Sequence, residues 1–337
     1  MVEILAEGGQ AHAGSVELAL RMVRAAAIAG ATAIKWQHLT PELIARPDAP
    51  LYWQDGYKDQ RQAFAANGTL SHGEWVRVAA ECERESIEFL STPFDDTAVA
   101  QLVDLGVRRF KLASGDLTNR PLLERVAVTG LPVILSTGAA NFDEVRRALA
   151  WWEDAGRKRS DVTLLACSLI YPCPPEHAHL DRIRRMRRAF NVPIGYSDHT
   201  REVETAVAAV ALGATVLEKH FALGPSHVPD TTFAVNAAGL ARYVKLAQLG
   251  EAMTADCRSD CEQAARVGAR RSLCAARDLP AGTLLASADL VPLRPGGGIE
   301  PDNLRFLVGT LLSRAYAEGE PLDHEELPEG LPVSGTR

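Results

Sequence analysis

The chain has 337 residues, which is too many for one small domain and fits one large domain followed by a small one. Hydrophobic residues make up 47% and charged residues 23%, and the net charge of −7 offers no sign of the basic face that nucleic acid requires. The sequence has neither a signal-peptide pattern after Met1 nor an apolar run of the ~20 residues that a membrane span needs, so we expect a cytoplasmic protein.

Short β-branched apolar runs alternate with longer segments of helical periodicity from Val2 to about Leu249. The predicted strands are Val2–Ala6, Thr32–Trp36, Ile87–Ser91, Arg109–Leu112, Pro132–Leu135, Val162–Ala166, Val192–Gly195 and Val216–Lys219. The predicted helices are Val16–Ala29, Glu74–Arg84, Thr97–Leu105, Leu122–Val128, Asp143–Trp152, Leu180–Phe190, Glu202–Leu212 and Ala238–Leu249. Eight such units predict an α/β protein with a closed (β/α)8 TIM barrel over residues 1–255.

A doubly wound open sheet is the alternative to the barrel. Such a sheet usually carries a glycine-rich nucleotide loop after its first strand, and the loop here reads EGGQAHAGS, which is not GxGxxG. The segment Thr40–Leu70 is predicted to be a long inserted loop, rich in Trp, Tyr, Gln and Pro. Loops of this length on a barrel are often lids or substrate-binding elements.

The composition and the hydrophobic pattern of the sequence change after the barrel region. Residues 256–270 are predicted to be a polar, charged linker, and residues 271–328 a compact, mostly β domain in which DLPAGTLL and YAEGEPL repeat one pattern. The tail, residues 329–337, is predicted to be disordered.

Polar residues follow every predicted strand, at the end where barrel enzymes carry their chemistry. Lys35 and Lys111 stand within or beside apolar strands, where a lysine is costly without a partner. A structural salt bridge is one explanation. A phosphate site is the better one, because the same rim gathers hydroxyl groups. These belong to Thr92, Ser114, Ser136 and Ser197.

Two histidines, His199 and His220, end neighbouring strands. Their imidazoles would hold a divalent metal with open positions for water and substrate, or would be ordinary hydrogen-bonded side chains. Glu7 and Glu218 lie on adjacent strands, and Glu7 is a candidate general base. The alternative for Glu7 is a salt bridge to Lys35 or Arg21.

Eight motifs in chain order resemble those of the sialic acid synthase family, the N-acetylneuraminate synthases and their legionaminic and pseudaminic acid relatives. The motifs are AEGGQAHAGS, AIKWQ, FLSTPFD, FKLASGDLTNRPLL, PVILSTG, SLIYPCP, PIGYSDHT and VLEKHF. The resemblance runs to about Leu327, and the C-terminal unit, with RRSL, an AG turn and LRPGGG, looks like that family's SAF (β-clip, antifreeze-like) domain.

The resemblance implies a reaction that joins phosphoenolpyruvate to the open-chain aldehyde of an N-acyl-mannosamine-like aldose, with water entering and phosphate leaving. It implies catalytic roles for Glu7, Lys111 and His220, and Mn²⁺ or Mg²⁺ on His199 and His220. Phosphoenolpyruvate would be bound by Lys35, Thr92, Lys111, Ser114, Ser136, Ser197 and Glu218. The aldose would face Gln37, Tyr171, Asp230 and the partner subunit's Arg294, in a domain-swapped homodimer.

This chain departs from the family pattern mostly at positions expected around the sugar. Ala11 stands where many relatives have Asn in the first loop, and Ala166–Cys167 replaces the usual His–Cys of the sixth strand. Leu169 replaces an Asn that precedes Tyr171, and Val228–Pro229–Asp230 replaces the common Gly-Pro-Asp. We therefore expect unchanged chemistry on a different or narrower aldehyde. Two other functions stay open: a metal-independent Schiff-base aldolase that uses Lys111 or Lys35, and a non-catalytic carbohydrate-binding relative.

Overall fold

The computed structural model describes residues 1–51, 56–255 and 260–328. The chain divides into two compact units, Met1–Ala255 and Asp256–Arg337, and each is described by itself. Predictions that fall on residues 256–259 or on the 329–337 tail lie outside the described residues.

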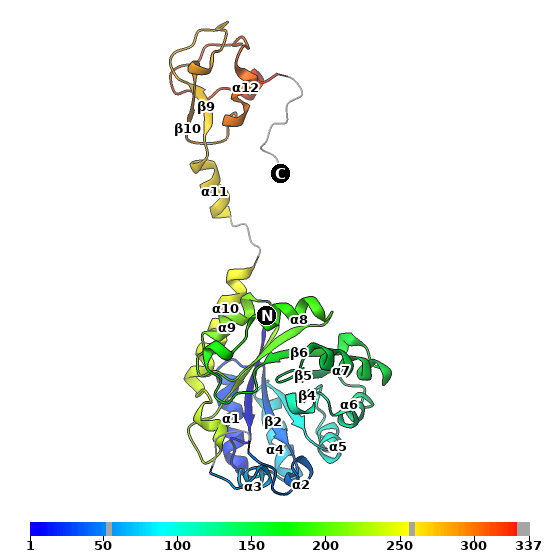
Figure 1. Ribbon diagram of the computed structural model, residues 1–337. Coiled ribbons are helices and arrows are strands. Elements are labelled where there is room, and N and C mark those ends of the chain that lie inside the picture. Colours follow the sequence, from blue (N-terminus) through cyan, green and yellow to red (C-terminus); the bar gives the residue numbers. More distant parts are fainter. Residues whose placement is uncertain (52–55, 256–259, 329–337) are drawn as a thin grey trace. The chain divides into compact units, whose positions relative to one another are not determined.

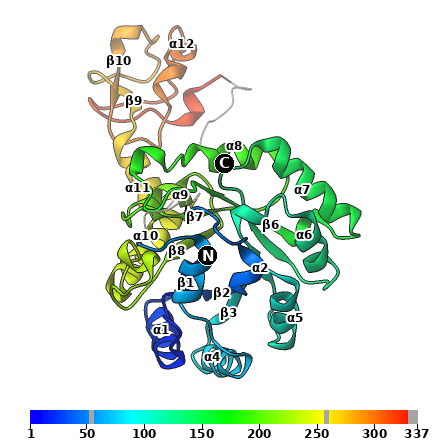
Figure 2. The same ribbon diagram turned by 60° about the horizontal axis from the view of Figure 1, so that its bottom comes forward.

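The first unit is a barrel of parallel strands surrounded by helices (Figures 1 and 2). Its strands are β1 (Glu3–Gly9), β2 (Ala33–His38), β3 (Glu88–Pro93), β4 (Phe110–Leu112), β5 (Val133–Ser136), β6 (Val162–Cys167), β7 (Ile194–Asp198) and β8 (Val216–His220). They follow the order β3-β2-β1-β8-β7-β6-β5-β4, and β3 lies next to β4. Because the first strand pairs with the last, the barrel prediction is confirmed and the open sheet is excluded.

Helices follow the strands and cover the outside of the barrel (Figure 2). They are α1 (Val16–Ile28), α4 (His72–Arg84), α5 (Asp96–Asp104), α6 (Arg120–Ala127), α7 (Phe142–Asp154), α8 (Asp181–Ala189), α9 (Thr205–Ala211) and α10 (Ala237–Thr254). Several begin at a side-chain cap, such as Ser71 and Asn141, each of which forms a capping box with the Glu three residues later. The strand and helix predictions therefore differ from the structure by only a few residues at their ends.

The barrel interior is stacked in layers that repeat every second residue along the strands. At the bottom, Arg109 bridges Glu3 and Glu88 at 2.6 Å each. Two residues further along, an apolar layer fills the barrel: Leu5, Ala33, Leu90, Ile134, Leu165 and Val216. Gly195 completes it, because a Cβ there would lie 2.5 Å from Leu165 Cδ2. Since side chains alternate across a strand, the next inward position on each strand reaches the upper rim.

The segment predicted to be a long loop holds two short helices, α2 (Pro41–Ile44) and α3 (Gln60–Ala66), which corrects the loop prediction. Asp59 caps α3 by accepting a hydrogen bond from the backbone of Gln62 at 2.9 Å. The side chain of Arg61 ties the two helices together, because it donates to the carbonyl of Ala45 at 2.8 Å. The insertion is thus an ordered part of the rim where it is described.

The second unit contains α11 (Asp260–Ala269), β9 (Ser272–Ala275), β10 (Leu290–Leu293) and α12 (Leu304–Leu307). The two strands pair antiparallel around a separate apolar core that includes Leu273, Leu285 and Tyr316. Helix α11 occupies most of the predicted linker, which the sequence had left without an element. Among the described residues of both units, no helix combines the length and the apolar character needed to cross a membrane.

Candidate active site

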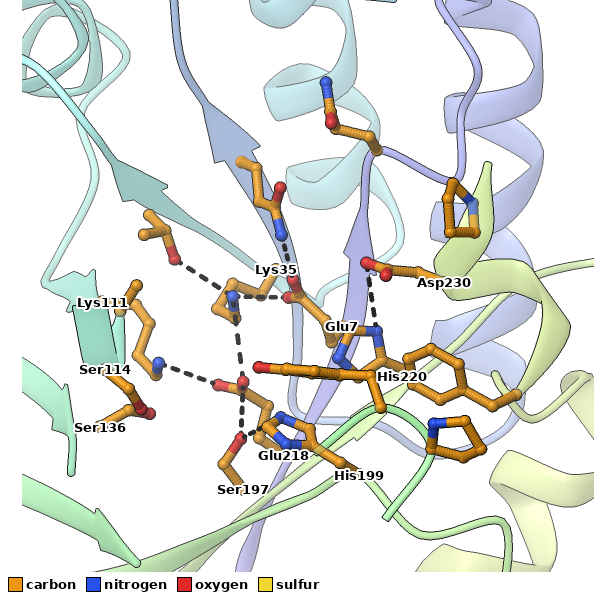
Figure 3. Close-up of a pocket in the computed structure, with 18 of the residues that line it drawn as sticks. Glu7, Lys35, Lys111, Ser114, Ser136, Ser197, His199, Glu218, His220 and Asp230 are labelled. Carbon is orange, nitrogen blue, oxygen red and sulfur yellow. Dashed lines mark hydrogen bonds and ion pairs between the residues drawn. The ribbon is translucent and has the colours of Figure 1, made fainter. Parts of the chain in front are cut away.

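A cavity of about 300 Å³ opens at the carboxyl ends of the strands. The strands contribute to its wall the layer of side chains above the apolar one, so their period-two pattern sets that part of its composition. Figure 3 shows many of the residues that line it. The sequence-predicted residues that line it are Glu7, Lys35, Gln37, Thr92, Lys111, Ser114, Ser136, Tyr171, Ser197, His199, Glu218, His220 and Asp230. The structure therefore brings together every predicted site residue of the barrel.

Two lysines and two glutamates form a buried ionic cluster on the cavity floor. Lys35 Nζ lies 2.6 Å from Glu7 Oε2 and 4.0 Å from Glu218 Oε1, while Lys111 Nζ lies 3.6 Å from Glu218 Oε2 (Figure 3). All four side chains are at most 6% exposed. Charges this deeply buried need partners, and each here has at least one.

The hydroxyl groups of the rim surround this cluster. Lys35 donates to Thr92 Oγ1 at 3.1 Å, and Ser197 donates to Glu218 Oε1 at 3.1 Å. Ser114 Oγ accepts from the backbone N–H of Gly138 at 2.9 Å. Ser136 Oγ is buried at the cavity wall, and it has no hydrogen-bond partner in the described part of the chain. A buried hydroxyl without a partner is destabilising unless a ligand or water meets it.

Burial and charge shift the pKa values of the cluster in different directions. Burial raises the pKa of Glu7 to about 7, with Glu218 adding to the effect and Lys35 opposing it. Burial would raise the pKa of Glu218 as well, but Lys111 and Lys35 outweigh it and hold that pKa below its usual value. Burial lowers the pKa of Lys111, and Glu218 only partly offsets this. Glu218 is thus the fixed anion, and Glu7 is poised to gain or lose a proton near neutral pH.

The two histidines face the cavity with neutral rings. Burial lowers the pKa of His199. Burial also lowers the pKa of His220 well below its usual value, and the neighbouring His199 adds to this effect. The ring centroids lie 5.4 Å apart, and Tyr171 packs on His199 at 4.2 Å. His199 Nδ1 donates to the carbonyl oxygen of Ser168 at 2.6 Å, so Nε2 carries the lone pair.

These features suit a divalent metal bound by a small number of protein ligands. Two neutral imidazoles converge, and a carbonyl fixes the tautomer of one, which is the usual support for a ligating histidine. Asp230 Oδ2 lies 3.6 Å from His220 Nδ1. Among the described residues, no group of three or more His, Cys, Asp or Glu side chains is arranged to hold a metal ion. A metal here would take its remaining ligands from water and substrate.

An outward-facing network holds the turn that carries His199. Lys219, 1% exposed, donates to Asp198 Oδ2 at 3.0 Å and to the carbonyl oxygens of Thr200 at 2.6 Å and Glu202 at 2.9 Å. Asp198 also accepts from the backbone N–H of Thr200 at 2.9 Å. Because residues alternate along β7 and β8, this network lies behind the strands while His199 and His220 point inward.

The residues that the resemblance places around the sugar come partly from loops. Gln37 donates to Glu7 Oε1 at 3.3 Å, and Asp230, in the short helix after β8, has a 35% exposed side chain. Burial raises the pKa of Asp230 to about 6, with Lys35 opposing it. Arg294 is exposed in the second unit, so its predicted role at the sugar is not part of this geometry.

The positions that depart from the family pattern do not line the cavity themselves. Ala11, Ala166 and Val228 are buried, and none of these or Leu169 is among the described residues of the cavity wall. Ala166 sits on β6 between Leu165 of the inner apolar layer and Cys167, so it faces outward. Three of the four positions have a lining residue close by in the chain, so the expectation that they surround the sugar stays a prediction.

Several lining residues escaped sequence reasoning. They are Gln10, Phe64, Asn67, Phe94, Arg201, Thr232 and Phe233. Phe64 and Asn67 belong to the inserted segment, whose length was the available signal. Gln10 follows β1 directly, and its place in the first loop was the other clue.

Comparisons with known proteins agree with this geometry. The model of the NeuB family matches residues 22–257, and that of the SAF domain matches residues 270–327. The chain is 34% identical to N,N'-diacetyllegionaminic acid synthase of Campylobacter jejuni, over 94% of this chain and 97% of that protein.

Two solved structures are also similar. The spore coat polysaccharide biosynthesis protein E of Chromobacterium violaceum superimposes with a TM-score of 0.80 at 27% identity, covering 97% of this chain and all of that one. The N-acetylneuraminic acid synthetase of Leptospira borgpetersenii, in complex with citrate, gives a TM-score of 0.71 at 30% identity, covering 78% and 90%. These matches agree with the (β/α)8 unit, its rim of lysines, glutamates and histidines, and the small β domain after it. The chain therefore belongs to the NeuB family of synthases and has a C-terminal SAF domain.

Proposed function

We propose that this chain condenses phosphoenolpyruvate with an N-acyl-mannosamine-like aldose and water, giving a nonulosonic acid and phosphate. One observation carries the proposal: a single cavity contains two buried lysines, a serine hydroxyl that has no partner among the described residues, two neutral imidazoles, and a glutamate of raised pKa. Named synthases of sialic-acid-like products among the relatives support it.

The floor of the cavity suits a small, highly charged anion. Lys35 and Lys111 supply two ammonium groups, and Ser136 supplies a hydroxyl that needs a partner. The backbone of Gly138 packs directly against Ser114, because a Cβ on Gly138 would lie 2.8 Å from Ser114 Oγ. Phosphoenolpyruvate would place its phosphate and carboxylate among these donors, with Thr92 and Ser197 at the border. Glu218 would hold the lysines in place, as it already pairs with both.

The imidazoles of His199 and His220 would hold the divalent metal, Mn²⁺ or Mg²⁺, near the bound aldehyde. The bound metal would polarise the aldehyde oxygen as a Lewis acid. Tyr171, packed on His199, and the ordered turn of residues 198–202 would keep the aldehyde carbon facing phosphoenolpyruvate. Proximity of this kind supplies a large share of catalysis in bond-forming enzymes.

Glu7 would act on the water. Carbon 3 of phosphoenolpyruvate forms the new bond to the aldehyde carbon, which leaves carbon 2 electron-poor. Water adds at carbon 2, and Glu7 accepts its proton. The carbonyl electron pair of the aldehyde passes to its oxygen, which takes up a proton and becomes a hydroxyl. The C–O bond to phosphate then breaks, its electron pair leaves with phosphate, and the carbon-2 hydroxyl gives its proton to the departing phosphate, which leaves the 2-keto acid. A pKa of about 7 lets Glu7 take this proton at neutral pH and release it afterwards.

The remaining contacts would define the aldose. Gln37, Tyr171 and Asp230 would bind it within the barrel. The partner subunit's Arg294 would reach its acyl group in a domain-swapped homodimer, which we propose for a cytoplasmic enzyme. The match of the SAF domain model to residues 270–327, which include Arg294, supports this assignment.

The test is a phosphate-release screen with phosphoenolpyruvate, Mn²⁺ and a panel of hexosamines, with mass spectrometry of the products. We expect one or more aldoses to yield stoichiometric phosphate and a product heavier by the pyruvate unit. The variants His199→Ala and His220→Ala should lose turnover and Mn²⁺ binding while keeping their circular dichroism spectra. Full activity in either would remove the metal assignment.

Lys111 favours a Schiff-base aldolase as a second candidate function. Burial lowers its pKa, as a Schiff-base aldolase requires. Borohydride added with substrate would trap such an intermediate, and turnover would be indifferent to EDTA. We expect no trapping and full loss of turnover with EDTA, because Lys111 is already paired with Glu218.

A further inference from the structure

The inserted segment contributes two residues to the cavity that the proposed reaction does not use. Phe64 lies in α3, and Asn67 follows its end. The side chain of Asn67 is buried, at 6% exposure. Asn67 lines the cavity beside Gln10 of the first loop of the barrel.

The amide of Asn67 has one orientation, set by Gln10. Gln10 Nε2 donates to the carbonyl oxygens of Phe64 and Gly68, each at 3.3 Å. Carbonyls only accept, so the amide nitrogen of Gln10 faces them and its Oε1 must accept a hydrogen bond. Asn67 Nδ2 fills that role at 3.1 Å. The oxygen of Asn67 is therefore the atom left over.

The backbone around Asn67 is fixed without a ligand. A Cβ on Gly68, whose φ is +81°, would lie 2.8 Å from Gly14 Cα, so the end of the insertion packs directly on the first loop. On the other side, the ring of His227 contacts the carbonyl oxygen of Ala66 at 3.2 Å. The insertion is thus held by the loops after β1 and β8, and Asn67 is positioned in advance.

Asn67 Oδ1 is buried and has no hydrogen-bond partner among the described residues. Leaving such an acceptor unsatisfied is destabilising, so its retention in a cavity wall indicates that a ligand supplies a donor. Phosphoenolpyruvate does not suit it, because its ionised oxygens are acceptors too. An aldose offers several donated hydrogens.

We propose that Asn67, oriented by Gln10, is a specificity-determining residue that accepts a hydrogen bond from the aldose, either from a hydroxyl or from the acylamino N–H. This proposal rests on the proposed function, since that function supplies the aldose. It assigns the inserted segment a part in choosing the acceptor rather than in binding phosphoenolpyruvate.

The test measures aldose binding by calorimetry, beside phosphate release, in wild type and in Asn67→Ala. The probes are N-acetylmannosamine, its 3-, 4- and 6-deoxy forms and its N-methyl derivative. In wild type, we expect one analogue to bind about 10-fold more weakly than the parent, as the loss of a buried hydrogen bond implies. In Asn67→Ala, the parent should weaken by a similar factor and that analogue should lose nothing further.

Controls separate this role from folding. Gln62→Ala removes an exposed amide from the same helix and should leave every value unchanged. Asn67→Leu keeps the volume of the side chain and should behave like Asn67→Ala, with the KM for phosphoenolpyruvate unaltered in both. Equal weakening of all aldoses, or a raised KM for phosphoenolpyruvate, would overturn the proposal.

The two proposals can fail separately. Aldose binding that depends on Asn67 without any phosphate release would sink the synthase function and keep the assignment of Asn67. Phosphate release that is indifferent to Asn67 would do the reverse.

Discussion

The two sides of the cavity are built differently. The side that we propose for phosphoenolpyruvate comes mainly from strand positions, one layer above the apolar core, and its lysines and glutamates are buried and mutually paired. The acceptor side draws on the first loop, the insertion and the segment after β8, and Asp230 there is 35% exposed. Strand positions are fixed by the register of the barrel, while loops tolerate change. The chemistry is therefore tied to the fold, and the choice of acceptor is not.

Glu7→Gln gives the largest expected effect, because Glu7 stands at the boundary between the two sides. The amide keeps the shape but cannot take the proton of water, so we expect kcat to fall by about 10²–10⁴-fold. Phosphate release at saturating substrates measures it. A loss confined to KM would place Glu7 in binding instead and would blur the boundary.

The variant Lys219→Met tests whether the position of His199 depends on the hydrogen-bond network of Lys219 and Asp198 behind the strands. The change leaves Asp198 buried without its cation, which we expect to lower the free energy of unfolding by about 3–5 kcal/mol. It should also weaken Mn²⁺ binding by roughly 10- to 100-fold, because the turn carrying His199 loses its anchor. Calorimetric Mn²⁺ titration at a temperature where the variant is folded is the readout. Unchanged Mn²⁺ affinity would show that the network is structural only.

The dependence of kcat/KM on pH tests the raised pKa of Glu7. Since its pKa is raised to about 7, the basic form is lost as pH falls, and kcat/KM should drop tenfold per pH unit below that value. Its contribution to stability has the opposite sign, because the folded state binds the proton more tightly. That contribution is full below the ordinary pKa of 4.5 and is lost as pH rises through about 7. A profile that is flat between pH 5 and 8 would contradict this assignment.

Arg294→Ala has the smallest expected effect and concerns the acceptor alone. We expect the KM for the aldose to rise by about 10-fold, as for one lost hydrogen bond to a charged group, with the KM for phosphoenolpyruvate unchanged. Steady-state kinetics of the full-length chain measures both. An unaltered KM for the aldose would remove Arg294 from the site.

Sequence reasoning predicted the strand-borne residues of the cavity well and the loop-borne residues poorly, for a physical reason. Lys35, Thr92, Ser136 and Glu218 lie within buried strands, near their carboxyl ends, so hydrophobic periodicity places them on one rim. Asn67 follows a short helix in an insertion, and its partner Gln10 is 57 residues away. No local pattern predicts such a pairing. The departures at Ala11 and Val228 suggest a changed sugar pocket, but both residues are buried outside the cavity wall, beside the lining residues Gln10 and Pro229.

The layering of the barrel also limits how this protein can vary. Along β1, the residues Glu3, Leu5 and Glu7 form in turn the bottom salt bridge, the core and the cavity wall, and β3 repeats the spacing with Glu88, Leu90 and Thr92. Deleting or inserting one residue within such a strand would turn all three functions outward at once. Length changes are tolerable only where the layers end, in the 40–70 insertion and in the loop after β8. Engineering for new acceptors should therefore vary the length of these two segments and leave the strands to point substitutions.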